Sequence, residues 1–357
     1  MIDSVILPNS RNTSGFNEVI VYGTPGEKVL FSLLLYPEQK VILDKEIYFF
    51  SADGSFSIRG LGKVMENYFI EPGISVVDSE KTFLLKFAYG DNFNMSHAIE
   101  LHIRYCRAKA FIDFTSFPLS RISESMTYSN TPEYISFISK KDATAILTAT
   151  YINNNQVQTS DFTLQTFSDD HKIYFFDVSS DVVLNMIQKK GIYIPYSQLM
   201  SWEVKMSDVV KKYTFNPISL PSPTTFLFRN AFLALETFTF KGLSTKEFNT
   251  EREFGVINDY TVVTSRNEKK EYTVNSGHLN ADQEDTLIDL VTSDVVYVRS
   301  GMEWLPVVIV GEDIKSSPER NIIHSFEITY RFTDNNNLTA ITGNVRSFDE
   351  SFDESFM

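Results

Sequence analysis

One stretch near the C-terminus decides the fold class: Ser325-Phe326-Glu327-Ile328-Thr329-Tyr330-Arg331-Phe332. Its apolar side chains occupy every second position. Because successive side chains of a β-strand point to opposite faces, this spacing places one set on a core and the other in water. The same alternation recurs along the chain, in Glu18–Tyr22, Val29–Tyr36, Glu46–Phe50, Lys81–Tyr89, Ile99–Tyr105, Ala145–Tyr151, Lys172–Asp177, Glu236–Phe240 and Asp259–Thr264. The sequence therefore predicts a mainly β protein.

Three short helices are predicted among these strands. Each has apolar side chains at helical spacing on one face: Leu61, Val64, Met65 and Tyr68; Val182, Val183, Met186 and Ile187; Leu287, Ile288 and Val291. Ser179 or Ser180 can cap the second helix. The third helix is predicted over residues 281–292, with Asn280 as its cap and acidic residues in its first turn, where the helix dipole is positive.

Two irregular stretches divide the chain. Phe117-Pro118-Leu119-Ser120 leads into a Ser-rich segment, and residues 216–225 contain three prolines, which cannot continue a helix or a central strand. Cuts at these places predict modules at 1–116, 117–216 and 217–335, followed by an acidic flexible tail at 336–357. We expect the first two to be tandem β-sandwiches of immunoglobulin or fibronectin III type, each with a short helix. We expect the third to be a β-sandwich with the helix at 281–292.

A short internal echo favours related modules. Ile47-Tyr48-Phe49-Phe50 recurs as Ile173-Tyr174-Phe175-Phe176, and each copy is followed by a predicted helix and another alternating strand. The tetrapeptide alone is compatible with chance, whereas the shared order of strand, helix and strand points to a repeated unit.

Composition excludes several classes of protein. The 357 residues include 46 acidic and 32 basic side chains, a net charge of -14, which argues against a nucleic-acid or anionic-membrane binder. Aromatics make up 14% of the chain, which excludes disorder of the whole. A single cysteine, Cys106, excludes an intrachain disulfide framework.

No apolar run approaches the roughly 20 residues that span a bilayer, and the N-terminus has no signal-peptide pattern, so we expect no membrane insertion.

The search for catalytic chemistry predicts no active site, no cofactor and no metal. The chain has no phosphate-binding loop, no dinucleotide fingerprint and no nucleophile elbow. Asp169-Asp170-His171 could supply metal ligands, but it lies between two strand patterns, where a polar turn is expected. Cys106 has Arg104 and Arg107 nearby, yet no base for a nucleophile is readable, and His102 alternates with apolar neighbours and should face solvent. A pair of glycosidase carboxylates stays open, because only the fold brings such pairs together.

The last residues repeat a short unit, Ser-Phe-Asp-Glu, at 347–350 and 351–354, followed by Ser355-Phe356-Met357. Such an acidic segment with isolated aromatics stays solvated on its own. It is either a disordered tail or a peptide that binds a groove on a partner protein. In the second case the partner-binding residues are Phe348, Phe352 and Phe356, whose spacing of four places them on one side of an induced helix.

The third module, within residues 217–335, contains three distinctive stretches: Phe226-Leu227-Phe228-Arg229-Asn230-Ala231-Phe232 with Glu236-Thr237-Phe238; the helix Asp282–Leu290 leading into Val295-Val296-Tyr297-Val298; and Trp304-Leu305-Pro306-Val307-Val308-Ile309 with the strand Ser325–Phe332. In these stretches the module resembles tail- or baseplate-type structural proteins of phages and prophages of Bacteroides-like bacteria. The repeated β-sandwich modules before it are similar to those that precede such a module in these proteins. The acidic tail departs from the family.

This resemblance implies a non-enzymatic virion component associated with the tail, baseplate or connector. Its partners would be other virion structural proteins and further copies of itself, assembled in the host cytoplasm. The aromatic-rich composition is compatible with stable association. The alternative is a surface adhesin or a carbohydrate-binding β-sandwich protein, and a third hypothesis is an enzyme with an unrecognised carboxylate site.

Overall fold

The computed structural model describes residues 2–71, 73–107, 119–120, 122–207, 209–257, 260–279, 281–313 and 325–333. The chain divides into two compact units. Unit 1 contains residues 1–221, 227–238 and 281–295, and unit 2 contains residues 222–226, 239–280 and 296–357. The boundary runs through two strands, so neither unit is one continuous stretch of sequence.

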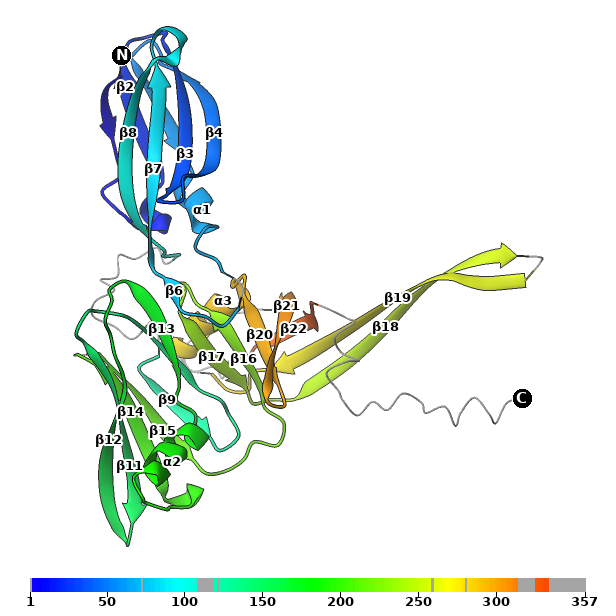
Figure 1. The fold of residues 1–357 in the computed structure, drawn as a ribbon. Coiled ribbons are helices and arrows are strands. Elements are labelled where there is room, and N and C mark those ends of the chain that lie inside the picture. The colour runs from blue at the N-terminus through cyan, green and yellow to red at the C-terminus, as the bar shows by residue number, and fades with distance from the viewer. Residues whose placement is uncertain are drawn as a thin grey trace. The chain divides into compact units, whose positions relative to one another are not determined.

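The first part of unit 1 is a β-sandwich (Figure 1). One sheet has the order β1-β2-β5 and the other the order β4-β3-β7-β8. The strands are β1 (Ile2–Ile6), β2 (Glu18–Gly23), β3 (Lys28–Tyr36), β4 (Lys40–Phe49), β5 (Ser55–Arg59), β7 (Glu80–Tyr89) and β8 (Met95–Arg104), with short helices η1 (Thr13–Gly15), α1 (Leu61–Glu66) and η2 (Asp91–Phe93). Val19 and Val21 of β2 face Phe31, Leu33 and other apolar side chains of the second sheet in one fully buried core, as the alternation of these strands predicts.

The second part of unit 1 is also a β-sandwich. Its sheets have the orders β10-β13-β6 and β12-β11-β14-β15-β9. The strands are β6 (Val77–Asp78), β9 (Glu124–Tyr128), β10 (Tyr134–Ile138), β11 (Thr144–Asn153), β12 (Gln156–Thr166), β13 (Lys172–Asp177), β14 (Leu199–Met206) and β15 (Val209–Asn216), with α2 (Ser180–Lys189) and η3 (Tyr196–Gln198). Trp202 stacks on Tyr213 in the core, with ring centroids 5.5 Å apart. The short strand β6 comes from the sequence of the first module and extends the sheet of the second.

The two sandwiches share one topology over six strands and differ in their first strand, since β1 pairs with β2 whereas β9 pairs with β15 in the other sheet. In the first, β2 pairs with β5, β3 pairs with β4 and β7, and β7 pairs with β8. In the second, β10 pairs with β13, β11 pairs with β12 and β14, and β14 pairs with β15. Each has its helix after the fourth strand of this set, α1 after β5 and α2 after β13. The predicted tandem repeat of sandwich modules, each with a short helix, is therefore confirmed.

The tetrapeptide that pointed to this repeat does not mark equivalent positions. Residues 47–49 lie in β4, whereas residues 173–176 lie in β13, and the topological counterpart of β13 is β5. The sequence echo is therefore a chance match, although the repeated architecture that it favoured is real. Two sandwiches can share a topology without sharing a sequence, because many different apolar residues can occupy the same inward-facing positions.

The C-terminal strands form one seven-stranded sheet of order β17-β16-β20-β21-β22-β19-β18. Its strands are β16 (Thr224–Arg229), β17 (Leu235–Phe240), β18 (Ser244–Ile257), β19 (Tyr260–Asn275), β20 (Val296–Ser300), β21 (Glu303–Asp313) and β22 (Glu327–Phe332), and α3 (Ala281–Val291) lies between β19 and β20 in the chain. The sequence predicted the two sheets of a sandwich here. Alternation identifies the buried face of each strand but not which strands pair, so the strands were predicted and their single sheet was not.

The predicted strands and helices are present within a few residues of their expected bounds. Ser179 holds the N-cap position of α2, but its side chain makes no cap hydrogen bond and instead receives the N–H of Glu133, 3.0 Å away. Among the described residues, no helix is long and apolar enough to cross a membrane. The module boundaries at 116 and 216 stay predictions. The cap residue Asn280 and the tail at 336–357 lie outside the described residues.

Candidate functional site

The turn between β16 and β17 is inserted into the interior of unit 1. Phe232, Leu233 and Ala234 are part of the core of the first sandwich, and each is at most 7% exposed. The backbone N–H of Arg107, just beyond β8, donates to the carbonyl of Ala231 over 2.9 Å. We call this turn and the side chains that contact it the junction. It brings together segments that the sequence assigned to three different modules.

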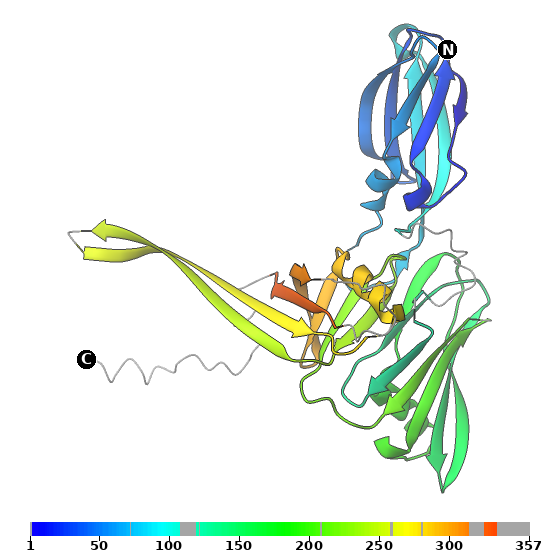
Figure 2. The ribbon, with the colours of Figure 1, turned by 180° about the vertical axis from the view of Figure 1, so that it is seen from behind.

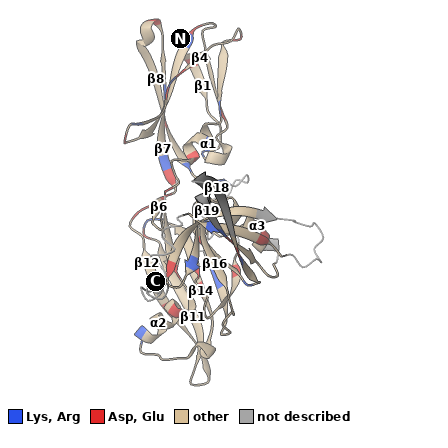
Figure 3. Cartoon of the chain, turned by 90° about the vertical axis from the view of Figure 1, so that its right-hand side faces the viewer, with Lys and Arg blue, Asp and Glu red and all other residues tan. Residues whose placement is uncertain are grey.

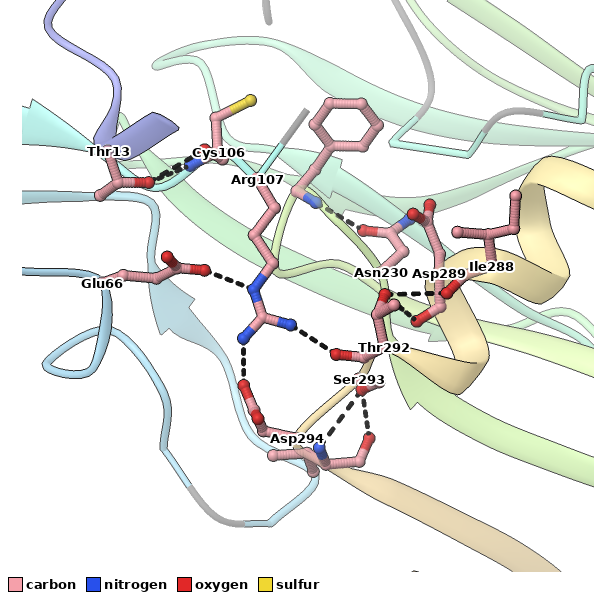
Figure 4. Close-up of polar contacts among 12 residues, drawn as sticks. Thr13, Glu66, Cys106, Arg107, Asn230, Ile288, Asp289, Thr292, Ser293 and Asp294 are labelled. Atoms are coloured by element: carbon pink, nitrogen blue, oxygen red, sulfur yellow. Dashed lines mark hydrogen bonds and ion pairs between the residues drawn. The ribbon is translucent and has the colours of Figure 1, made fainter. Parts of the chain in front are cut away.

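Arg107 is the first polar centre of the junction (Figure 4). Its guanidinium donates to the carbonyl oxygen of Thr292 over 2.7 Å and forms ion pairs with Glu66 at the end of α1 and with Asp294 after α3. The Arg107 side chain is 27% exposed and that of Glu66 is 17% exposed. The Arg107–Glu66 pair is partly buried and charge-assisted, so it is stronger than an ordinary surface pair, whereas Asp294 is 52% exposed and contributes less. Arg107 therefore connects the first sandwich to the segment that follows α3.

Two neighbours complete this side of the junction. Tyr105 lies under the guanidinium, whose central carbon is 6.0 Å from the ring centroid, and burial raises the pKa of the Tyr105 hydroxyl well above its usual value. Arg229, 5% exposed, donates to the carbonyl of Leu233 over 3.0 Å and to that of Gly73 over 3.1 Å. The pocket beside these groups has a cavity volume of only about 10 Å³, far below the roughly 300 Å³ at which small-molecule sites begin.

The second polar centre is a buried cluster of four side chains, Ser120, Lys211, Asn230 and Glu236. The side chains of Lys211 and Glu236 are 4% and 2% exposed, and Lys211 Nζ lies 3.6 Å from Glu236 Oε1. Ser120 Oγ receives a 2.9 Å hydrogen bond from Lys211 and donates to Glu236. Asn230 Nδ2 donates to Glu236 Oε2 over 3.1 Å and to the carbonyl of Leu119 over 2.6 Å. Charges at this depth persist only when paired and hydrogen-bonded, as they are here.

The strand pattern explains how these charges come to be inside. Lys211 lies on the inward face of β15 with the buried Tyr213 and Phe215, and Glu236 lies on the inward face of β17 with Phe238 and Phe240. Tyr213 is fully buried beneath Lys211, whose Nζ is 5.5 Å from the ring centroid. Burial, reinforced by Glu133 and Glu236, raises the pKa of Tyr213 well above its usual value, so its hydroxyl keeps its proton.

The residues that the sequence analysis singled out for chemistry are not brought together. His102 is exposed, as expected, with 64% of its side chain accessible. Asp169 and Asp170 form turn contacts, Asp169 with Lys172 at 3.0 Å and Asp170 with the N–H of Lys141 at 2.8 Å. In the parts of the chain that the structure describes, no three His, Cys, Asp or Glu side chains gather as metal ligands.

Cys106 is fully buried at the end of the first sandwich. Its backbone N–H donates to the hydroxyl of Thr13 over 3.0 Å, and that hydroxyl donates back to the Cys106 carbonyl over 3.0 Å. The predicted partner-binding residues Phe348, Phe352 and Phe356 lie outside the described residues. Sequence reasoning missed Lys211, Asn230 and Glu236. Lys211 and Glu236 could have been found, because each is a charged side chain on the apolar face of a strand.

A long two-stranded ribbon is the most prominent feature of unit 2 (Figures 1 and 2). β18 and β19 pair with each other from Ser244–Val274 to Ile257–Tyr260, whereas β19 pairs with β22 only over Tyr272–Asn275. Residues 247–257 and 260–271, here called the β-ribbon, therefore extend beyond the rest of their sheet by about 35 Å, at roughly 3.4 Å per residue. Phe248 and Phe254 of the β-ribbon are 48% and 65% exposed.

Residues of both charges, Lys and Arg as well as Asp and Glu, occur along the strands in Figure 3. No family model and no curated protein matches the sequence. Among solved structures, the chain is similar to the crystal structure of invasin, a bacterial integrin-binding protein, with 10% sequence identity and a TM-score of 0.25. The match covers 93% of this chain and 54% of that one, so the chain spans about half the length of invasin.

Proposed function

We propose that this protein is a non-enzymatic structural component of a phage virion, associated with the tail, baseplate or connector, and that it assembles with copies of itself and with other virion proteins. The resemblance of residues 217–335 to such proteins motivates the proposal. The β-ribbon is the single observation that carries it, since it lies in this same region and offers unpaired strand edges for assembly.

A pair of strands such as the β-ribbon gains stability when a further strand pairs with it. A two-stranded hairpin with no core beneath it is at best marginally stable in water. β18 is the outermost strand of its sheet, so its outer edge is unpaired within the described chain, and β19 pairs with a third strand over only four residues. Such an edge is a template for a strand of another chain, with main-chain hydrogen bonds as the source of affinity.

The exposed aromatic side chains of the β-ribbon also favour a role in assembly. Phe248 and Phe254 are six residues apart in β18. The register shift in this region adds its extra residue to β19, so the alternation of β18 is not interrupted. Both side chains therefore lie on one face of the β-ribbon. Lys270 Nζ lies 5.7 Å from the ring centroid of Phe248 but leaves the ring half exposed. Exposed aromatics on one face are the usual centre of a protein interface.

Electron microscopy of the purified full-length protein tests this function. We expect discrete rings or other closed assemblies, because a heterologous contact repeated between identical copies closes into a ring when the rotation between neighbours divides a full turn. Monomers that bind a glycan on an array would contradict the proposal and support the adhesin or carbohydrate-binding alternative.

A further inference from the structure

The buried cluster of Ser120, Lys211, Asn230 and Glu236 contains an amide group in addition to its ion pair. One carboxylate, that of Glu236, contacts an amine through one oxygen and an amide through the other. Oε1 lies 3.6 Å from Lys211 Nζ, and Oε2 accepts a 3.1 Å hydrogen bond from Asn230 Nδ2. The amine and the amide are therefore neighbours around one group that can carry a proton between them.

The amide of Asn230 is held in a polarised state. Its Oδ1 accepts hydrogen bonds from the backbone N–H of Phe232, over 3.0 Å, and of Ala234, over 3.1 Å. Two backbone donors on one carbonyl oxygen draw electron density from the carbon and stabilise the negative charge that forms on the oxygen when a nucleophile adds. Asn230 is 2% exposed, so water is excluded and these electrostatic effects are strong.

We propose that Lys211 and Asn230 form an intramolecular amide cross-link, with Glu236 as the proton carrier. Glu236 accepts a proton from the Lys211 ammonium through Oε1, which leaves a neutral amine nucleophile. Nζ adds to Asn230 Cγ, and the developing oxyanion stays bound to the N–H groups of Phe232 and Ala234.

The second half of the reaction closes the balance. Glu236 delivers its proton through Oε2 to Nδ2, the Cγ–Nδ2 bond breaks, and ammonia leaves. The Glu236 carboxylate then takes up the second proton of Nζ, so the new amide is neutral and Glu236 ends protonated. One C–N bond forms and one breaks, and no atom is oxidised or reduced. The reaction therefore needs no cofactor, and the fold contributes by holding the amine and the amide against the two oxygens of one carboxylate.

The cross-link joins β15 of the second sandwich to the turn that is inserted into the core of the first. Ser120 holds Lys211 on the side of the carboxylate, since it contacts both groups. The consequence is a covalent tie at the junction, in addition to the Arg107 contacts.

Intact-mass spectrometry of the purified full-length protein tests this proposal. We expect a mass below that of the sequence by about 17 Da, the mass of one ammonia. Trypsin cleaves after Lys205, Lys212, Arg229 and Lys241, so the digest should contain a branched peptide made of residues 206–212 and 230–241. Both observations are needed, because cyclisation of Asn230 to a succinimide also loses ammonia but yields no branched peptide.

Variants identify the participating groups. Lys211→Arg and Glu236→Gln should each restore the full mass and abolish the branched peptide. Lys212→Arg is the matched control, since Lys212 neighbours Lys211 on the same strand but is 58% exposed, and it should keep both signatures. Circular dichroism confirms that each variant is folded. A wild-type protein with the full sequence mass, or a loss of ammonia that persists in Lys211→Arg, would overturn the proposal.

Discussion

The guanidinium of Arg107 donates a 2.7 Å hydrogen bond to the backbone carbonyl of Thr292, a residue 185 positions further along the chain. The same side chain pairs with Glu66, 41 positions earlier. A single cation therefore joins three segments that are remote in sequence, and it does so within unit 1. The stability of this unit should depend on it more than on any ordinary surface arginine.

Replacement of Arg107 by Ala should lower the free energy of unfolding of unit 1 by about 1–3 kcal/mol, because the partly buried Glu66 carboxylate and the Thr292 carbonyl lose a charged donor. Arg59→Ala is the control. Arg59 also pairs with a glutamate, Glu18 at 2.9 Å, but its side chain is 78% exposed, so its loss should destabilise the protein clearly less than the loss of Arg107. Urea denaturation followed by circular dichroism measures both. Equal effects of the two variants would contradict the role assigned to Arg107.

Phe232→Ala should be more damaging, with a loss of about 3–5 kcal/mol, since it leaves a cavity where the turn enters the core. Phe49→Ala removes the same atoms from a side chain that is 62% exposed and should change stability little. Trp202 is buried in unit 1, so its fluorescence in a Trp304→Phe background follows this unfolding. A small effect of Phe232→Ala would mean that the turn does not support the sandwich core.

The strands could be predicted from the sequence because the alternation of apolar and polar residues is a local property of each strand. Phe83, Leu85 and Phe87 were expected on one face of a strand, and all three are fully buried. The junction could not be predicted from the sequence. Lys211 and Glu236 are 25 positions apart, in strands of different sheets, and only the packing of those sheets brings them together. Each charge on an inward face was nevertheless a readable anomaly, because a buried charge requires a partner of opposite sign.

Tyr330 should make unit 2 sensitive to alkaline pH. Burial, followed by the neighbouring Tyr272, raises the pKa of Tyr330 to about 12, against about 10 in an unfolded chain. Between these values the unfolded state has released the proton and the folded state has not. Stability is therefore fully present below pH of about 10 and falls as the pH rises towards 12, by up to about 2–3 kcal/mol.

Denaturant titrations at several alkaline pH values, read from Trp304 fluorescence, measure this slope. Tyr330→Phe keeps the ring that stacks on Tyr272 at 5.3 Å but removes the ionisable group, so the slope should become shallower. An unchanged slope in Tyr330→Phe would assign the alkaline sensitivity to other groups.

The acidic tail leads to a separate prediction. If Phe348, Phe352 and Phe356 bind a groove on a partner protein, deletion of residues 346–357 should reduce incorporation of the protein into assembled particles and leave its folding unchanged. Replacement of the three Phe residues by Ser, with the acidic residues kept, separates the aromatic contribution from the charge. Unchanged incorporation of both variants would show that the tail is not a docking segment.

The β-ribbon is proposed to mediate assembly, and light scattering of the purified protein tests this role most directly. The comparison is between the full chain and a trimmed variant in which an Asn-Gly turn joins Phe248 directly to Lys270, two residues that already face each other across the hairpin. We predict that the full chain has the mass of a closed oligomer and that the trimmed variant has the mass of one folded chain. A full chain that is monomeric, or a trimmed variant that assembles like the full chain, would contradict the account.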